Sequence, residues 1–125
     1  MKLTMEVPSG AHLVRGYGAG EGRVGESRMT SACIVSPQRL ITDWRPQNPA
    51  ALEFDDLAPV FELAPELALL GWAGGQPYLP ARQRAWFLER RIAIEPMELG
   101  AACRTYNVLV QDGRSVAALL FPAVD

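Results

Sequence analysis

The segment VAALLF, residues 116–121, consists of six apolar side chains that follow one another without a polar interruption. A strand that faces water on one side alternates between apolar and polar residues, whereas a strand covered on both faces does not. Pro122 ends the run, because proline lacks the backbone N–H that a central strand requires. We therefore expect residues 116–121 to form the middle strand of a covered sheet.

Strand and helix patterns alternate in the part of the chain that leads to this run. Residues 66–70 and 92–95 are apolar strand candidates, the second of which we expect to end at Pro96. Residues 81–91 and 99–110 are helix candidates. Strand, helix, strand, helix and strand in this order predict an α/β architecture built in layers.

The N-terminal third has the composition of β structure. Residues 12–17, 28–35 and 40–43 are strand candidates, and residues 55–63 are a candidate for a short or irregular helix. Residues 44–49 contain two prolines and read as a surface loop, because neither side is long enough to form a domain. We expect one α/β domain over residues 1–125.

Composition and charge exclude several classes of protein. The chain has 125 residues with 12 basic and 14 acidic side chains, whereas a dedicated nucleic-acid-binding domain is usually strongly basic. No apolar run approaches the roughly 20 residues that a membrane span needs. The N-terminus lacks the apolar core of a signal peptide, and two distant cysteines suit a reducing compartment. We expect a cytoplasmic protein without nucleic acid or a membrane span.

Eleven of the twelve basic residues are arginine. Codon bias in a GC-rich genome is one explanation. The other is that some arginines make the bidentate contacts with carboxylate or phosphate that lysine makes poorly.

Residues suited to metal binding or catalysis are scarce. His12 is the only histidine, and Cys33 and Cys103 stand far apart with no second cysteine near either. Zinc sites and nucleophile–histidine pairs draw on these residue types. We therefore predict no catalytic residue, no metal and no cofactor, and expect a chain that is not an enzyme, although the sequence leaves that question open.

Two segments could still contribute to a ligand site. Gly74 and Gly75 follow a buried strand, where α/β folds commonly bind ligands, so they form either a plain loop or an anion cradle. Arg104, Thr105 and Asn107 stand in a helix candidate, where the last two have lower helix propensity than alanine or leucine. Their side chains either tie the helix to a neighbouring strand or loop, or line a pocket.

A pocket between the 71–75 loop and the 100–107 segment is therefore one hypothesis for function. Asp43 and Trp44, at the end of another strand candidate, could lie close to it. Such a site would bind a small molecule or an anion, and it could belong to an enzyme whose catalytic residues the sequence does not display.

The helix candidate at residues 81–91 suggests a different function. Trp86 and Phe87 lie off the centre of its apolar stripe, and if exposed they would mark a surface that contacts a partner. Its arginines form either a solvated face or part of an anion or partner surface. The apolar stripe itself consists of Ala81, Ala85, Leu88 and Ile92.

The C-terminal third resembles a small family of domains of unknown function. Its members include the third assembly factor of mitochondrial respiratory complex I and an adipogenesis-associated relative. The resemblance covers nearly the whole chain, and the Thr105-Tyr106-Asn107 element is its most specific part. The segments that carry it are IAIEPM (92–97), AACRTYNVL (101–109) and DGR (112–114), supported by residues 31–37, 44–46 and 69–71.

The resemblance implies a three-layer fold with a mixed five-stranded sheet. In that fold the last strand is central and antiparallel to the others, and a small additional β element packs at one side. The mitochondrial relatives are non-catalytic assembly factors, so our leading hypothesis is a bacterial-type interaction or assembly domain with a protein partner. The residues indicate neither the identity of that partner nor the oligomeric state.

Overall fold

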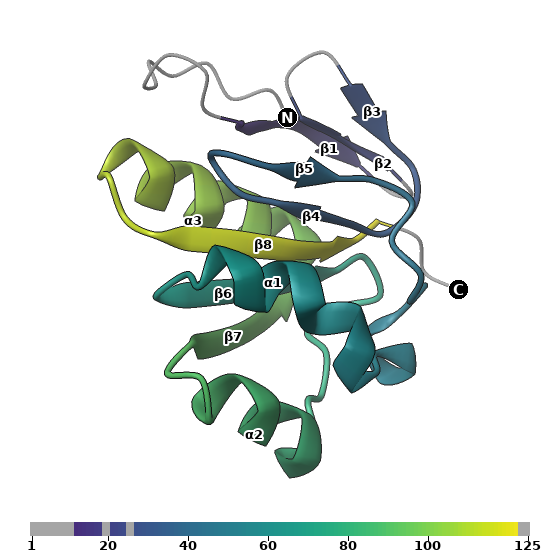
Figure 1. Ribbon diagram of the computed structural model, residues 1–125. Helices are drawn as coiled ribbons and strands as arrows, with labels where there is room; N and C mark the ends of the chain where they lie inside the picture. Colours follow the sequence, from purple (N-terminus) through teal and green to yellow (C-terminus); the bar gives the residue numbers. More distant parts are fainter. Residues whose placement is uncertain (1–11, 19–20, 25–26, 123–125) are drawn as a thin grey trace.

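The computed structural model describes residues 12–18, 21–24 and 27–122 (Figure 1). The two 3₁₀ turns are η1 (Pro49–Ala51) and η2 (Phe54–Leu57). The helices are α1 (Ala58–Leu63), α2 (Ala81–Leu88) and α3 (Leu99–Gln111). The strands are β1 (Val14–Gly18), β2 (Glu21–Val24), β3 (Ser27–Met29), β4 (Cys33–Val35), β5 (Leu40–Ile41), β6 (Leu67–Trp72), β7 (Ala93–Glu98) and β8 (Val116–Phe121).

The larger sheet has five strands in the order β5-β4-β8-β6-β7, so β8 is the central strand. All six of its side chains are buried, which confirms the expectation drawn from the unbroken apolar run. Its side chains alternate between two cores. Val116, Ala118 and Leu120 pack with α3 on one face, while Leu119 and Phe121 pack under α1 and α2 on the other.

The direction predicted for the last strand is wrong. β8 is antiparallel to β4 but parallel to β6, and β6 is in turn parallel to β7. The reason is the short link after α3: the helix runs back along the sheet, and Gly113, at φ +74°, turns the chain directly into β8. The strand therefore starts from the same end of the sheet as β7 did, as in a parallel crossover.

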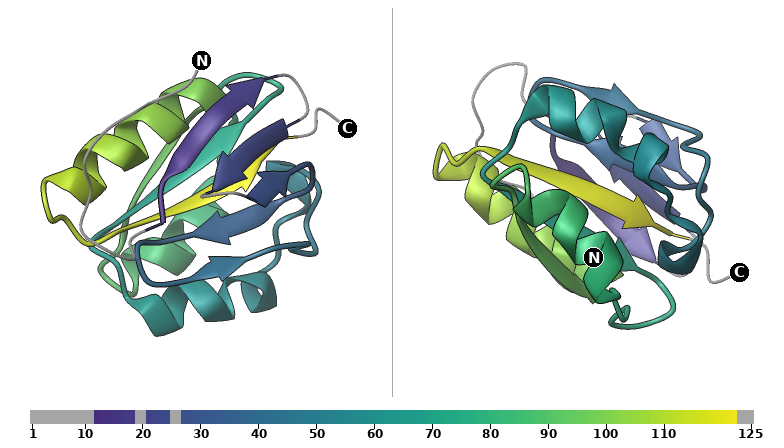
Figure 2. Two further views of the ribbon diagram at one scale, coloured as in Figure 1. Left: turned by 90° about the horizontal axis from the view of Figure 1, so that it is seen from above. Right: turned by 60° about the horizontal axis from the view of Figure 1, so that its bottom comes forward.

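A second, three-stranded sheet of order β1-β2-β3 packs at one side, as the resemblance implied. The strand candidate at residues 28–35 is divided between the two sheets, because β3 joins the small sheet and β4 joins the large one. Figures 1 and 2 show α3 on one face of the larger sheet and both α1 and α2 on the other. The helix candidate at residues 55–63 is realised as η2 followed by α1.

Two expectations for the middle of the chain fail. β7 continues through Pro96 to Glu98, which it can do because it is an edge strand with one unpaired side. The proposed apolar stripe of α2 is also wrong, since Ala81 is exposed and Leu88 is 63% exposed. The buried face of α2 instead consists of Gln83 and Phe87. Gln83 can be buried because its Nε2 donates to the carbonyl oxygen of Leu52 at 3.0 Å.

Close packing holds α3 against the sheet. A Cβ atom at Gly71 would lie 2.6 Å from the Cβ of Ala102, which is closer than any normal contact. The glycine in β6 and the small residue in α3 therefore allow the helix to approach the strand directly.

We predict that Leu119→Ala lowers the free energy of unfolding by about 2–5 kcal/mol, because a fully buried leucine in the central strand would leave a cavity. Urea denaturation measures the loss. Val108→Ala, at a half-exposed position of α3, is the control and should change stability by less than about 0.5 kcal/mol. A similar small change for Leu119→Ala would contradict a central, doubly covered β8.

Candidate functional site

The polar residues of α3 join the helix to the first strand. Asn107 is fully buried, and its side-chain amide pairs with the backbone of Val14 in both directions. The Val14 N–H donates to Oδ1 at 3.0 Å, and Nδ2 donates to the Val14 carbonyl at 2.7 Å. Next to it, the Tyr106 hydroxyl donates to the carbonyl oxygen of His12 at 2.7 Å. Both side chains of α3 therefore act as backbone partners for the segment that leads into β1, which is the edge strand of the smaller sheet.

This arrangement decides between the two explanations for the polar segment. Asn107 ties α3 to a neighbouring strand, so its amide is not available to line a pocket. Thr105 is half-buried and Arg104 is exposed on the same helix. These two hydrogen bonds agree with the structural explanation for Asn107, which lies in the most specific part of the motif.

Asp43 and Trp44 occupy different environments. Asp43 is exposed, adopts a left-handed backbone conformation at φ +52°, and accepts a hydrogen bond from the Ser31 hydroxyl at 2.9 Å. Trp44 is buried in the core beside Phe121, with 5.5 Å between the ring centroids. Its Nε1 donates to the carbonyl oxygen of Asp56 at 3.0 Å. Trp44 is therefore a core residue that anchors η2.

Gly74 and Gly75 form a tight turn after β6. The Gly75 N–H donates to the carbonyl oxygen of Trp72 at 3.2 Å, and its φ of +117° explains the choice of glycine. Gly74 lies against the indole of Trp72, where a Cβ atom would come within 2.5 Å of the ring. Turn geometry and ring packing thus account for both glycines. The hollows described below are lined by other residues.

A groove between α1 and α2 brings together aromatic and arginine side chains that lie far apart in the sequence. We call it the aromatic groove and define it by Phe54, Phe61, Arg82, Trp86 and Arg90. The Phe54 ring centroid lies 5.7 Å from that of Phe61 and 5.8 Å from that of Trp86. Phe54 is 40% exposed, so the centre of this cluster is open to solvent.

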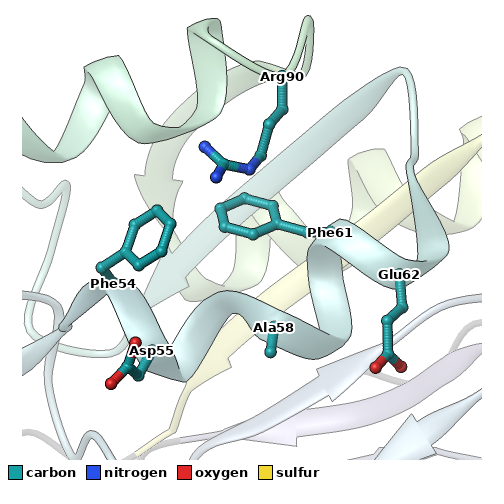
Figure 3. A pocket seen from close by; sticks show the side chains of 6 residues that line it. All are labelled: Phe54, Asp55, Ala58, Phe61, Glu62 and Arg90. Carbon is teal, nitrogen blue, oxygen red and sulfur yellow. The ribbon is translucent and has the colours of Figure 1, made fainter.

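Arginine side chains lie on these rings. The Arg90 guanidinium carbon is 4.2 Å from the centroid of Phe61 and 4.8 Å from that of Phe54. Figure 3 shows the guanidinium beside these two rings. Its Nη1 also donates to the carbonyl oxygen of Trp86 at 3.2 Å. Arg82 lies 5.3 Å from the ring centroid of Trp86. Such cation–π contacts contribute about 0.5–1 kcal/mol each at exposed sites, and they hold the guanidinium groups in place.

Two hollows flank Phe54. The larger has a volume of about 580 Å³ and contains Phe61 and Arg90 (Figure 3). The other, of about 440 Å³, contains Arg82 and Trp86. Phe54 and Asp55 line both, so the two hollows are adjacent parts of one surface.

A charge pair fixes the turn that carries Phe54. Arg45 Nε donates to Oδ1 of Asp56 at 2.7 Å, and Asp56 Oδ2 accepts from the backbone N–H of Glu53 at 2.8 Å. The hydrogen bond from Arg45 lowers the pKa of the Asp56 carboxyl below its ordinary value. Asp56 therefore stays ionised at neutral pH and holds η2 against the Trp44 anchor.

The sequence identified only part of this surface. Trp86 is half-exposed at its wall, but Phe87 is fully buried and contributes to the core instead. Phe54 and Phe61 were missed. Their separation of seven residues places them on one side of a helical segment, and this spacing was the available signal.

Within residues 12–18, 21–24 and 27–122, no three His, Cys, Asp or Glu side chains gather as metal ligands require. None of the helices in this part of the chain is long and apolar enough to cross a membrane.

We predict that Cys33 and Cys103 react slowly with thiol reagents in the folded protein. Both are buried, and burial raises the pKa of each thiol to about 12. At about pH 8, only about one thiol in ten thousand is then ionised, whereas an ordinary cysteine with a pKa near 8.5 is substantially ionised. Alkylation followed by mass spectrometry, with urea-unfolded protein as the reactive control, measures the difference. Rapid labelling of Cys103 in the folded state would reveal a reactive thiol.

We predict that Asn107→Ala lowers the free energy of unfolding by about 2–4 kcal/mol, because it leaves the buried N–H and carbonyl of Val14 without partners. Asn107→Asp should also be destabilising, since a carboxylate cannot donate to the Val14 carbonyl. Thermal and urea unfolding measure both variants, with Thr105→Ala as the neighbouring control. If both Asn107 variants retained wild-type stability, the attachment of β1 would not depend on this amide.

Comparison with known proteins places the chain in a family. Residues 14–121 match the family described as "Protein of unknown function (DUF498/DUF598)". An uncharacterised protein of Rhodobacter capsulatus is 30% identical over 116 residues, which cover 91% of this chain and 87% of that protein.

Solved structures of similar proteins support the same family assignment. A Bordetella parapertussis protein has a TM-score of 0.83 at 32% identity, covering 92% of this chain and 99% of that one. A Bordetella pertussis protein described as a Mth938-like domain has a TM-score of 0.81 at 27% identity, covering 100% and 94%. The chain therefore belongs to the DUF498/DUF598 or Mth938-like family, which includes the third assembly factor of mitochondrial respiratory complex I.

Proposed function

We propose that this chain is a non-enzymatic protein-interaction or assembly domain of the cytoplasm, which contacts its partner through the aromatic groove. The observation that carries the proposal is the open aromatic cluster around Phe54. Folding alone does not require a large apolar side chain to be 40% exposed between two hollows. A grouped apolar patch of this kind commonly marks a contact surface.

The composition of the groove supports a protein as the partner. Aromatic residues and arginine are enriched at the centres of protein interfaces, where they supply large contact areas and directed hydrogen bonds. Arg90 is already stacked on two rings, so little side-chain entropy remains to be lost on binding. The larger hollow can accept a bulky side chain of the partner.

Family membership supports assembly as the type of function. The assembly factor of complex I in the same family is a relative, and we propose a comparable, non-catalytic role for this chain. A small-molecule or anion site between the 71–75 loop and the 100–107 segment has weaker support. Asn107 is occupied by backbone contacts, and Trp44 lies in the core.

We predict that affinity purification of the tagged full chain from native lysate recovers a stoichiometric partner protein, and that Phe54→Ala reduces the recovery at least tenfold. Trp86→Ala should have the same direction of effect, because it removes the other wall of the groove. Quantitative mass spectrometry of the purified material measures the recovery.

Tyr78→Ala is the matched control, since Tyr78 is 83% exposed and stands outside the groove. It should leave recovery unchanged. Thermal unfolding of each variant separates loss of contact from loss of fold. Recovery of the tagged wild-type chain with neither another protein nor an untagged second copy of itself, or equal loss with Tyr78→Ala, would contradict the proposal.

A further inference from the structure

The walls of the aromatic groove carry opposite charges. Asp55 and Glu62 are exposed on η2 and α1, along one wall. Arg90 projects from the other side, just beyond the end of α2, as Figure 3 shows. Arg82, on α2, lines the adjoining hollow together with Glu53, the acidic residue that precedes η2. Phe54 stands between the acidic and the basic wall.

A surface of this kind is complementary to itself. A two-fold axis maps the same patch of one copy onto that of another, so each residue meets whatever lies on the far side of the axis. With the axis passing near Phe54, the acidic wall of one copy faces the basic wall of the other, and this pairing occurs twice. Uniform charge on the groove would instead repel a second copy.

We propose that two copies of this chain pair through the aromatic groove about such an axis. The exposed part of the Phe54 ring of each copy packs over the larger hollow of the other, and Arg82 and Arg90 face the acidic wall across the axis. This inference rests on the proposed function, in that the groove is a protein-contact surface, and specifies its occupant as a second copy of the chain.

The hollow is large enough for this arrangement. It measures about 580 Å³, whereas an engineered cavity of roughly 150 Å³ in another protein holds benzene. Phe54 is exposed in the single copy, so its ring can leave solvent without rearrangement of the core. Burial of both rings supplies the apolar centre that a dimer interface needs.

The charged side chains on the two walls of the groove can pair with those of a second copy. Glu62 is paired within its own chain with Arg39 at 3.0 Å, but both side chains remain largely exposed, and such pairs are weak enough to rearrange. Arg90 is held in position by stacking on Phe54 and Phe61. The formal net charge of −2 adds little repulsion between copies.

Charge reversal tests the pairing. Wild-type chain should show a concentration-dependent monomer–dimer equilibrium in analytical ultracentrifugation up to about 1 mM, the weak end of specific affinities. Asp55→Arg with Glu62→Arg makes both walls basic, and Arg82→Glu with Arg90→Glu makes both walls acidic. Each double variant should raise the dimer dissociation constant at least tenfold, because it now meets like charge across the axis.

The decisive experiment measures association in a mixture of the two double variants. The basic-walled and acidic-walled chains should associate with each other, with an affinity within about tenfold of wild type, although neither pairs with itself. Restored association also shows that both variants are folded. The single variants Asp55→Arg and Arg82→Glu repeat the test without disturbing the stacked Arg90, and should show the same pattern to a smaller extent.

Matched charge changes outside the groove control for net charge. Glu95→Arg with Asp112→Arg, and Arg104→Glu with Arg114→Glu, alter the same number of exposed charges elsewhere. They should leave the dissociation constant within about threefold of wild type. The proposed pairing would be overturned by any of three results. These are an equal loss of dimer affinity in the control variants, no association in the mixture, and a wild-type chain that stays monomeric at every concentration.

The outcome separates this inference from the proposed function. If the wild-type chain is monomeric but still retains a different protein that Phe54→Ala loses, the groove is a contact surface and the second copy is not its occupant. If neither association occurs, both proposals are wrong. If the copies pair and the charge-reversal pattern holds, the groove serves self-association.

Discussion

Both faces of β8 must be covered, and the rest of the structure follows from this requirement. The six apolar side chains of β8 divide between two cores, one under α3 and one under α1 and α2. A strand of this kind loses its stability if either layer is missing, since each exposed leucine or phenylalanine costs about 1.5–3 kcal/mol of transfer free energy. The chain before β8 therefore has to supply both layers, and the whole chain has only 125 residues.

The two layers are unequal, and this inequality creates the groove. On one face, the thirteen residues of α3 lie close to β6, at the distance that Gly71 and Ala102 permit, and the Asn107 amide extends that layer to β1. On the other face, α1 has six residues and α2 has eight. Two short helices cover the sheet but leave space between them at its outer surface. Phe54, Phe61 and Trp86 meet there, part in the core and part in solvent.

The parts of this structure that depend on local patterns were predictable. The unbroken apolar run identified the central strand, and α3 and its terminal glycine were recognisable from spacing and turn chemistry. The direction of β8 was mispredicted because the family resemblance implied a strand antiparallel to the others, whereas the short link after α3 leads into a strand parallel to β6. The prediction of the apolar stripe of α2 was wrong because helical spacing cannot say which face a short helix buries. The buried face of α2 includes Gln83, whose side chain has a backbone partner.

The candidate site was harder to predict because it depends on contacts between distant segments. Asn107 stood out correctly as unusual, but a buried amide that pairs with a backbone and one that binds a ligand have the same sequence signature. Phe54 and Phe61 meet Trp86 and Arg90 only after α1 and α2 settle on the same face of the sheet, which no spacing encodes.

The abundance of arginine gains a physical role at this point, whatever its origin in codon usage. A planar guanidinium can stack on the faces of Phe54 and Phe61 while its Nη1 donates to the carbonyl oxygen of Trp86, whereas a lysine ammonium offers a strongly hydrated point charge. Arg90 therefore covers apolar rings and presents a fixed donor at the same time. A surface that is both apolar and charged in this way stays compatible with water when alone, and retains the shape and charge that a protein contact requires.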